Sequence, residues 1–364
     1  MDTKEFERIL NETIIPSTAS NEEQVEKIER LYGCAASKMP PMLFRYRRCD
    51  ERSLDAFYKD KVWISTPESM NDGFDTRLFF DKKPIIEWLN WFESENAKAG
   101  LKSFFAEESE LPANIAEIPG MEQAFNAIKI APLQQKDDFI ASFHSFVYED
   151  VSAVSEAIAS IAQQSLKFCC LSERIDSSAM WGLYSENETG FALAYDCKNL
   201  FSDVPLENGF NRTCTCLPII YSDSRYQVPL DCIQSMIAYR LMYLAITRSN
   251  YGAFAPQAAF NLLSRIPFPD KLFATKIALY KSNEWRREEE WRLFCTSSNE
   301  PAFQNEAHSC FTLKPKAIYL GRRIKPIFEK ILTDIAREKA ITIYKMRLDD
   351  NSPAYELLPE HIEN

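Results

Sequence analysis

A run of glutamates is the part of this sequence whose residue types most suggest chemistry. Residues 288–290 are consecutive glutamates, and they precede an aromatic-rich segment, 291–295, that is typical of a β-strand. Alternate side chains share a face of an extended backbone, so Glu288 and Glu290 are expected on the same side as Arg292. Carboxylates this close repel each other, and with burial this raises the pKa of at least one of them. Such a pair suits general base catalysis or the stabilisation of a cationic transition state.

The same stretch also fits a structural interpretation. A solvated acidic turn can lead into a strand without any catalytic role. In that case Arg286, Arg287 and Arg292 neutralise the glutamates. Spacing alone leaves both interpretations open.

Three further patches of polar and aromatic residues lie near predicted strand ends, at 43–47, 63–75 and 170–196. They contain arginine, tyrosine and tryptophan, which can stack on a flat ring and pair with phosphate. The hydroxyl groups of Ser65 and Thr66 can hydrogen-bond a sugar or hold a neighbouring strand. These patches therefore fit a site for a nucleotide-like ligand.

Some residues of these patches have two interpretations. Asn71 lies in a loop rich in turn-forming residues, where it either shapes the turn or contacts a ligand. Trp181 and Tyr184 are one helical turn apart, and this spacing fits a buried core as well as a stacking platform.

Several familiar catalytic signatures are missing from the sequence. It contains neither a G-x-x-x-x-G-K-[ST] nor a G-x-G-x-x-G phosphate-binding loop. A G-x-S-x-G elbow is also missing, and the 3 histidines are isolated. The 10 cysteines form no C-x-x-C pair and no zinc-binding spacing. We therefore expect no metal and disfavour P-loop and serine-triad chemistry.

The composition indicates a folded, acidic protein. The chain has 364 residues, of which 46% are hydrophobic, and a net charge of −11. This charge argues against a broad surface that neutralises phosphates. No apolar run approaches the roughly 18 residues that span a bilayer, and the charged N-terminus lacks the apolar segment of a secretory signal. We expect a cytoplasmic location, reduced thiols and no membrane partner.

Hydrophobic periodicity predicts the elements that position these residues. A helix is expected over 324–339, and predicted strands cover 42–47, 62–66, 166–171, 190–196, 218–221, 291–295, 309–313, 317–320 and 341–346. The strands around the helix at 324–339 suggest a crossover unit. The expected fold is α+β with a mixed sheet.

The pattern also predicts how the chain is divided. Residues 1–41 are expected to form a helical N-terminal appendage and linker. Ser20, with Glu23 three residues later, predicts the start of its second helix, and residues 33–41 are expected to be the linker. Residues 42–348 are expected to form a single α+β domain with helical insertions at about 77–165 and 225–281. The polar residues 349–364 are expected to form a loosely held tail.

The motifs resemble a bacterial family catalogued as domain of unknown function 2971. The resemblance covers 43 to about 321, and is carried by L-F-R-Y-R (43–47), V-W-I-S-T-P-E-S-M-N-D-G-F-D (62–75), C-L-S-E…M-W-G-L-Y…G-F-A-L-A-Y-D (170–196) and K-x-x-x-W-x-x-E-x-E-W-R (281–292). The motif order is also similar to that of the ADP-ribosyltransferase superfamily of the Arg-Ser-Glu type. This second resemblance implies a mainly antiparallel, split sheet with NAD bound in a cleft.

The superfamily resemblance implies roles for individual residues. Arg45 or Arg47 would hold the NAD pyrophosphate or ribose, and the sequence does not choose between them. Ser65 and Thr66 would support the nicotinamide ribose. Further candidate NAD-contacting residues are Tyr46, Asn71, Trp181, Tyr184, Lys281 and Arg292.

The same resemblance implies that two glutamates carry the reaction. Glu290 would stabilise the ribosyl cation that forms when the nicotinamide–ribose bond breaks. Glu288 would orient or deprotonate the acceptor, which is water, a protein or a nucleic acid.

Three functional hypotheses follow. The first is an NAD-consuming ADP-ribosyltransferase or NAD glycohydrolase, in a bacterial toxin or anti-phage defence system. The second is a non-catalytic binding or sensor module of such a system, with a protein partner encoded in the same operon. The third is a metal-dependent nuclease that uses Asp72, Asp75, Glu288 and Glu290.

Overall fold

A computed structural model describes most of the predicted core of the protein. The described residues are 3–77, 79, 81–92, 94–104, 110, 126, 130, 166–198, 204–205, 211–235, 269–297, 308–353 and 355–363. Much of the predicted helical insertions at about 77–165 and 225–281 lies outside these residues. Among the described residues, no helix combines the length and apolar character needed to cross a membrane.

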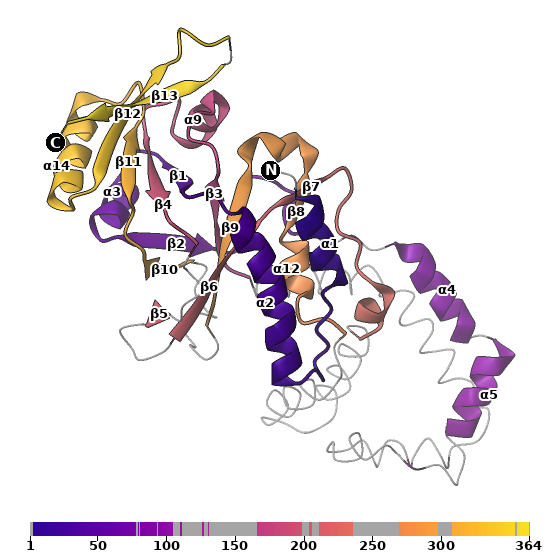
Figure 1. The fold of residues 1–364 in the computed structure, drawn as a ribbon. Helices are drawn as coiled ribbons and strands as arrows, with labels where there is room; N and C mark the ends of the chain where they lie inside the picture. Colours follow the sequence, from indigo (N-terminus) through magenta and orange to yellow (C-terminus); the bar gives the residue numbers. More distant parts are fainter. Residues whose placement is uncertain are drawn as a thin grey trace.

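Short helices accompany the strands along the chain (Figure 1). Within the described residues they are α1 (Lys4–Glu12), α2 (Asn21–Lys38), α3 (Glu51–Tyr58), α4 (Lys82–Phe92), α5 (Glu95–Phe104), α9 (Ser178–Tyr184), α12 (Phe273–Ile277) and α14 (Pro326–Glu338), with the 3₁₀ helices η1 (Pro67–Ser69) and η3 (Asn283–Glu288).

The core of the fold is one mixed, mainly antiparallel sheet. Its strands are β1 (Leu43–Arg47), β2 (Lys61–Ser65), β3 (Phe168–Ser172), β4 (Phe191–Tyr195), β5 (Val204–Pro205), β6 (Asn211–Pro218), β9 (Glu290–Ser297), β10 (His308–Thr312), β11 (Ala317–Leu320), β12 (Thr342–Leu348) and β13 (Leu357–Ile362). The main order is β13-β12-β11-β4-β1-β3-β9-β6-β5, and β7 (Ile220–Ser222) pairs with β8 (Tyr280–Ser282) apart from it. This arrangement confirms the predicted α+β class.

The predicted crossover unit is also present. β11 and β12 pair in parallel, and α14 connects them. Most other strand pairs in the sheet are antiparallel.

The sheet divides at β3. One end of β3 pairs with β1, where Phe44 lies opposite Ser172, and the other end pairs with β2, where Ser65 lies opposite Phe168. On its other edge β3 pairs along its length with β9. Because directly opposed residues share a face, this register decides which side chains of the four strands can meet.

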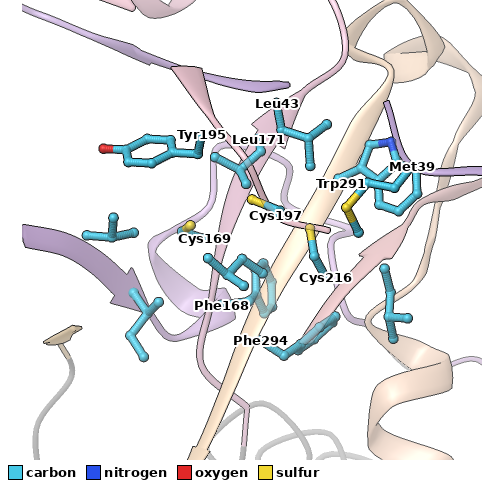
Figure 2. Packing of buried hydrophobic residues seen from close by; sticks show 14 of the residues in the cluster. Met39, Leu43, Phe168, Cys169, Leu171, Tyr195, Cys197, Cys216, Trp291 and Phe294 are labelled. Atoms are coloured by element: carbon cyan, nitrogen blue, oxygen red, sulfur yellow. The ribbon is translucent and has the colours of Figure 1, made fainter. Parts of the chain in front are cut away.

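Apolar side chains cover both faces of the sheet. One large cluster includes Leu43 and Leu171 together with Trp291, whose side chain is fully buried (Figure 2). A second cluster gathers around Tyr46 and Trp181, where α9 packs on β1. Burial on both faces explains why the central strands contain few exposed positions.

The N-terminal helices pack on the core of the domain. Phe6, Leu10 and Leu31 are fully buried in the same cluster as the sheet residues. Ser20 caps α2 by accepting a hydrogen bond from the Glu23 backbone N–H at 3.2 Å, as the sequence predicts. The helix continues through residues 33–38, which we expected to belong to a linker.

A buried ion pair between α12 and the loop before it holds the N-terminal segment through hydrogen bonds. Lys276 Nζ lies 2.6 Å from Asp270 Oδ2 and donates to the Thr13 carbonyl at 2.7 Å. Asp270 Oδ1 accepts the backbone N–H of Ile15 at 3.2 Å. The pair therefore fixes where the N-terminal helices sit on the sheet.

Replacing Asp270 by asparagine is expected to weaken the fold by about 2 kcal/mol, because the buried Lys276 ammonium loses its carboxylate partner and keeps only neutral acceptors. Urea unfolding followed by circular dichroism would measure the change. The matched control is Glu29→Gln on the exposed surface of α2, for which a change below about 0.5 kcal/mol is expected. Equal stability of the Asp270→Asn and wild-type proteins would contradict this prediction.

The predicted loose tail at 349–364 is wrong for residues 357–362. Residues Leu357–Ile362 form β13, which pairs antiparallel with β12. The Leu357 side chain is fully buried, and its backbone N–H donates to the Asp176 carbonyl at 2.9 Å. The sequence indicated a tail because the segment is polar, but an edge strand that buries few side chains has the same composition.

Candidate active site

The two glutamates singled out by the sequence meet in the structure, but not along one extended strand. Glu288 ends the 3₁₀ helix η3, Glu289 adopts a left-handed conformation with φ 42° and ψ 57°, and Glu290 begins β9. The tight turn at Glu289 brings the flanking carboxylates together. Our expectation of a shared strand face holds for Glu290 and Arg292, but it is wrong for Glu288.

Lys281 lies between the two carboxylates. Its Nζ is 2.6 Å from Glu288 Oε2 and 2.7 Å from Glu290 Oε2. The lysine comes from β8, and its ammonium group lies 5.0 Å from the centroid of the Trp285 ring. A single cation thus links the two acids and lowers their mutual repulsion.

Arg292 completes a buried cluster of charged side chains, which we call the carboxylate cluster. Its members are Asp75, Lys281, Glu288, Glu290 and Arg292. The Arg292 side chain is fully buried, and it donates to Glu290 Oε1 at 2.8 Å and to both oxygens of Asp75 at 2.8 and 2.5 Å. It also donates to the Ala278 carbonyl at 2.6 Å and lies 4.3 Å from the centroid of the Phe168 ring. A guanidinium with this many partners is rigidly fixed.

The charges of this cluster do not balance when every group is ionised. Asp75, Glu288 and Glu290 carry three negative charges, while Lys281 and Arg292 carry two positive charges. Because all five side chains are buried, the surplus negative charge is costly. One carboxyl group should therefore bind a proton more readily than an ordinary glutamate.

The surplus charge falls on Glu288. Burial raises the pKa of Glu288, and repulsion from Glu290 adds to this effect against the attraction of Lys281. Burial alone would also raise the pKa of Glu290, but Arg292 and Lys281 lower it to about 2. Neighbours that move two carboxyl pKa values in opposite directions are a feature of acid–base sites.

A chain of hydrogen bonds connects Glu288 to the surface. The Tyr184 hydroxyl, at the end of α9, donates to Glu288 Oε1. The Asn71 side-chain amide donates to the Tyr184 hydroxyl at 2.9 Å, and Asn71 is exposed. Tyr184 therefore covers the outer carboxylate and separates it from solvent.

Replacing Tyr184 by phenylalanine is expected to raise the pKa of Glu288 further, because the hydroxyl hydrogen bond favours the ionised carboxylate. At neutral pH the buried Oε1 atom of Glu288 would lose its hydrogen-bond donor, which should lower the free energy of unfolding by about 1 to 3 kcal/mol. Carbon-detected NMR titration of labelled glutamate carboxyl groups would measure the pKa. Asn71→Ala is the control, because it leaves the hydroxyl in place, and an unchanged titration of the Tyr184→Phe protein would contradict the prediction.

Two site residues were missed by the sequence analysis. Ser172 lies opposite Glu290 on the neighbouring strand, and its hydroxyl donates to the Glu288 carbonyl at 2.6 Å. The Tyr221 hydroxyl accepts the Glu290 backbone N–H at 2.8 Å. Ser172 belongs to the C-L-S-E motif at 170–173, and this motif was the only signal in the sequence that could have indicated it.

Arg45 and Arg47 do not join the carboxylate cluster. Phe44, Ser172 and Glu290 are opposed in register across β1, β3 and β9, so their side chains share one face. Arg45 and Arg47 alternate with Phe44 and therefore lie on the opposite face of the sheet.

The other predicted ligand-contacting residues occupy separate places. Tyr46 packs edge-on against Trp181 with ring centroids 5.1 Å apart, and Trp181 is fully buried in the core. Ser65 lies opposite Phe168 and so shares the carboxylate face, next to the ring that contacts Arg292. Thr66 follows at the start of the 3₁₀ helix η1, with no cap hydrogen bond from its side chain.

The acids proposed for a metal-dependent nuclease have other partners. Asp75, Glu288 and Glu290 are all hydrogen-bonded to Lys281 or Arg292. In the part of the chain that the structure describes, no group of three or more histidine, cysteine, aspartate or glutamate residues is placed to hold a metal ion.

A small cavity adjoins the cluster. It has a volume of about 150 Å³ and is lined by residues that include Tyr221, Arg286, Glu289 and Glu290. Ligand pockets for drug-sized molecules have about 300 to 1,000 Å³. The cavity therefore does not accommodate a dinucleotide in this conformation.

Comparison with known proteins gives one match. The model of a protein family of unknown function (DUF2971) matches residues 180–293. The matched segment includes Tyr184, Lys281, Glu288, Glu290 and Arg292, and it supports the resemblance to this family. No curated protein and no solved structure matches the chain.

Proposed function

We propose that the protein is an NAD-consuming enzyme that breaks the bond between nicotinamide and ribose. ADP-ribose would then pass to water or to a protein or nucleic-acid acceptor. The observation that carries this proposal is the buried pair of Glu288 and Glu290, which share Lys281 and have pKa values moved in opposite directions.

Glu290 provides a permanent negative charge. When the C–N bond breaks, its electron pair leaves with nicotinamide and positive charge develops on the ribose carbon. With its pKa near 2, Glu290 stays ionised at every physiological pH. A fixed charge in a site with little water stabilises such a cation.

Glu288 is suited to receive the proton of the acceptor. As the oxygen of water or of an acceptor hydroxyl bonds to the ribose carbon, its proton would pass to Glu288. The raised pKa of Glu288 makes it a better base than an ordinary glutamate. The two carboxyl groups thus have separate roles that follow from their neighbours.

Substrate entry requires movement of Tyr184. Both carboxylate groups are almost fully buried, and the Tyr184 hydroxyl occupies the outer oxygen of Glu288. We propose that NAD enters from the side of Asn71 and displaces Tyr184. Closure of such a side chain over the reacting groups would also exclude water.

This chemistry fits the biological setting proposed from the sequence. An enzyme that consumes NAD is harmful to the cell that makes it, which suits a bacterial toxin or anti-phage defence protein. A partner protein encoded in the same operon would then restrain the activity until it is needed.

Incubation of the purified full-length chain with NAD tests the proposal. Release of free nicotinamide, followed by chromatography, is expected, together with a fall in cellular NAD when the protein is expressed. The Glu289→Gln protein is expected to release nicotinamide at the wild-type rate. Glu289 is half-exposed and pairs with Arg174 at 3.3 Å, outside the buried carboxylate pair. NAD that stays intact both in solution and in expressing cells would overturn the proposal.

The alternative is a non-catalytic binding module. Two observations favour it: every oxygen of the two carboxylates is already hydrogen-bonded, and Arg45 and Arg47 lie on the other face of the sheet. In that case the cluster would serve to fix the fold. Tight binding of a partner protein without any NAD turnover would support this alternative.

A further inference from the structure

A groove with mainly apolar walls lies between α3 and α14 (Figure 1). Its volume is about 490 Å³, which is larger than the cavity of about 150 Å³ beside the carboxylate cluster. Leu54 and Tyr58 line it on the side of α3, and Phe328 and Ile335 line it on the side of α14. The two helices thus leave apolar side chains in contact with solvent between them.

The groove lies on the side of the sheet away from the carboxylate cluster. Phe57 of α3 packs against Phe191 of β4, with ring centroids 6.2 Å apart. Phe44 lies opposite Ala194, so Phe191 alternates with the residues of β4 that share the carboxylate face. The buried Leu332 of α14 belongs to the same apolar cluster as Phe191. A molecule bound in the groove therefore does not contact the carboxylate cluster.

An apolar stripe on α14 continues from the groove onto the exposed surface. Ile327, Ile331 and Ile335 follow one another at intervals of four residues and so lie along one face of the helix. Ile327 is 60% exposed, Ile331 is 36% exposed, and Tyr58 across the groove is 54% exposed. We define the α3–α14 surface as this stripe with the apolar residues beside it: Leu54, Tyr58, Ile327, Phe328, Ile331 and Ile335. Exposed apolar residues that adjoin one another mark interaction sites.

Two charged residues border the stripe without a partner. Lys330 and Asp334 are exposed, and neither side chain forms an ion pair or a hydrogen bond within the part of the chain that the structure describes. Asp55 and Lys59 have the same spacing on α3 and do pair, at 2.7 Å. A base that precedes its acid by four residues has the less favourable orientation for such a pair. Both charges of α14 are therefore available to another molecule.

We propose that the protein forms a homodimer in which the α3–α14 surfaces of two copies pack together, with the two α14 helices antiparallel. Twofold symmetry brings the same flank of each helix together in reverse order. Lys330 of one copy then lies opposite Asp334 of the other, and this ion pair forms twice. Ile327 and Ile331 of each copy pack against the apolar stripe of the other and become buried.

The charge pattern favours a second copy over other occupants of the groove. A lysine and an aspartate four residues apart match their own reversed order, which is what twofold pairing requires. A small apolar ligand would fill the groove and leave Ile327 exposed, because Ile327 does not line it. A different protein would not need the charges of α14 to complement themselves. The proposal goes beyond the proposed function and does not rest on it.

Sedimentation equilibrium of the full-length protein tests the dimer. We expect the wild type at twice the mass of one chain. Ile331→Asp should raise the dissociation constant by about tenfold or more, because it places a carboxylate in an apolar contact. Val25→Asp is the matched control and should stay dimeric, since Val25 is a β-branched residue of α2 that is 53% exposed.

Two results of this measurement would overturn the proposal. One is a wild type that stays monomeric at high micromolar concentration, which would leave the groove to a small apolar ligand or to a different protein. The other is a dimer whose dissociation constant is the same for the wild type and for Ile331→Asp.

A charge reversal tests the antiparallel arrangement independently of the apolar contact. Lys330→Asp places like charges opposite each other twice in the dimer and should weaken it by about threefold or more. Adding Asp334→Lys to Lys330→Asp restores opposite charges and should restore the wild-type dissociation constant. Both residues are exposed, so these proteins should fold. A double variant as weak as Lys330→Asp alone would contradict the antiparallel pairing.

The dimer and the proposed reaction can be tested separately. Glu288→Gln should dimerise as the wild type does, because the carboxylate cluster lies on the other face of the sheet. Failure of NAD cleavage would therefore leave the dimer unaffected, and a monomeric wild type would leave the proposed reaction standing.

Discussion

Replacing Glu288 by glutamine is expected to lower the rate of NAD cleavage by about 10²- to 10⁴-fold, because the acceptor would lose its base. The fold should not be weakened by the same change. Ionised Glu288 carries the surplus negative charge of the buried cluster, and glutamine removes that charge while keeping the shape. Nicotinamide release and urea unfolding, measured on the same preparation, would check both parts.

The pH dependence of stability follows from the direction of the Glu288 pKa shift. The folded-state pKa lies above the ordinary value of 4.5, so the stability contributed by protonated Glu288 is fully present below that value. It is lost as the pH rises through the raised pKa. The Glu288→Gln protein should therefore equal or exceed the wild type in stability at neutral pH, and the difference should shrink in acid.

The Glu290→Gln substitution is expected to affect stability in the opposite direction to Glu288→Gln. The pKa of Glu290 is lowered to about 2 from 4.5, so its ionised form stabilises the fold by about 3 kcal/mol at neutral pH. Glutamine at this position should therefore reduce both stability and turnover. If Glu288→Gln destabilised the protein as much as Glu290→Gln, the assignment of the surplus charge to Glu288 would be wrong.

The second large effect concerns Arg292. Arg292→Met is expected to destabilise the protein by about 3 to 5 kcal/mol, because it leaves Asp75 and Glu290 buried without their cation. Methionine retains much of the apolar volume, so the loss reports on charge and hydrogen bonding rather than on a cavity. Urea unfolding at neutral pH would measure it.

Two comparisons make this result specific. Arg286→Met removes an exposed arginine that lies 5.4 Å from the Tyr221 ring centroid, and a cost of about 1 kcal/mol or less is expected. Adding Asp75→Asn to Arg292→Met should cost less than the sum of the two single changes, since the residues act as a pair. Additive losses would indicate that the Arg292–Asp75 contact contributes little.

The sequence analysis identified most residues of the buried carboxylate cluster but not their supports. The acidic run at 288–290 indicated a carboxylate pair, and repulsion with burial indicated a shifted pKa. The serine next to Glu290, however, is Ser172 and not Ser65. Both residues end short strands, and only strand pairing distinguishes them.

The N-terminal and C-terminal segments also show that the sequence predicts local motifs but not the structure that depends on packing. Ser20 was recognised as a helix cap because capping depends on residues three positions apart. The expected linker at 33–41 and the expected tail at 349–364 were read from composition. Their helix and strand depend on packing against β6 and β12, which composition does not contain.

The sequence by itself determined the α+β class and the proximity of the two glutamates. These features depend on local spacing and residue chemistry. Only the tertiary structure decided that Arg45 and Arg47 face away from Glu290, because a side chain's face depends on the register between β1, β3 and β9. The structure also decided which glutamate carries the surplus charge, since this depends on where Lys281 and Arg292 meet the pair.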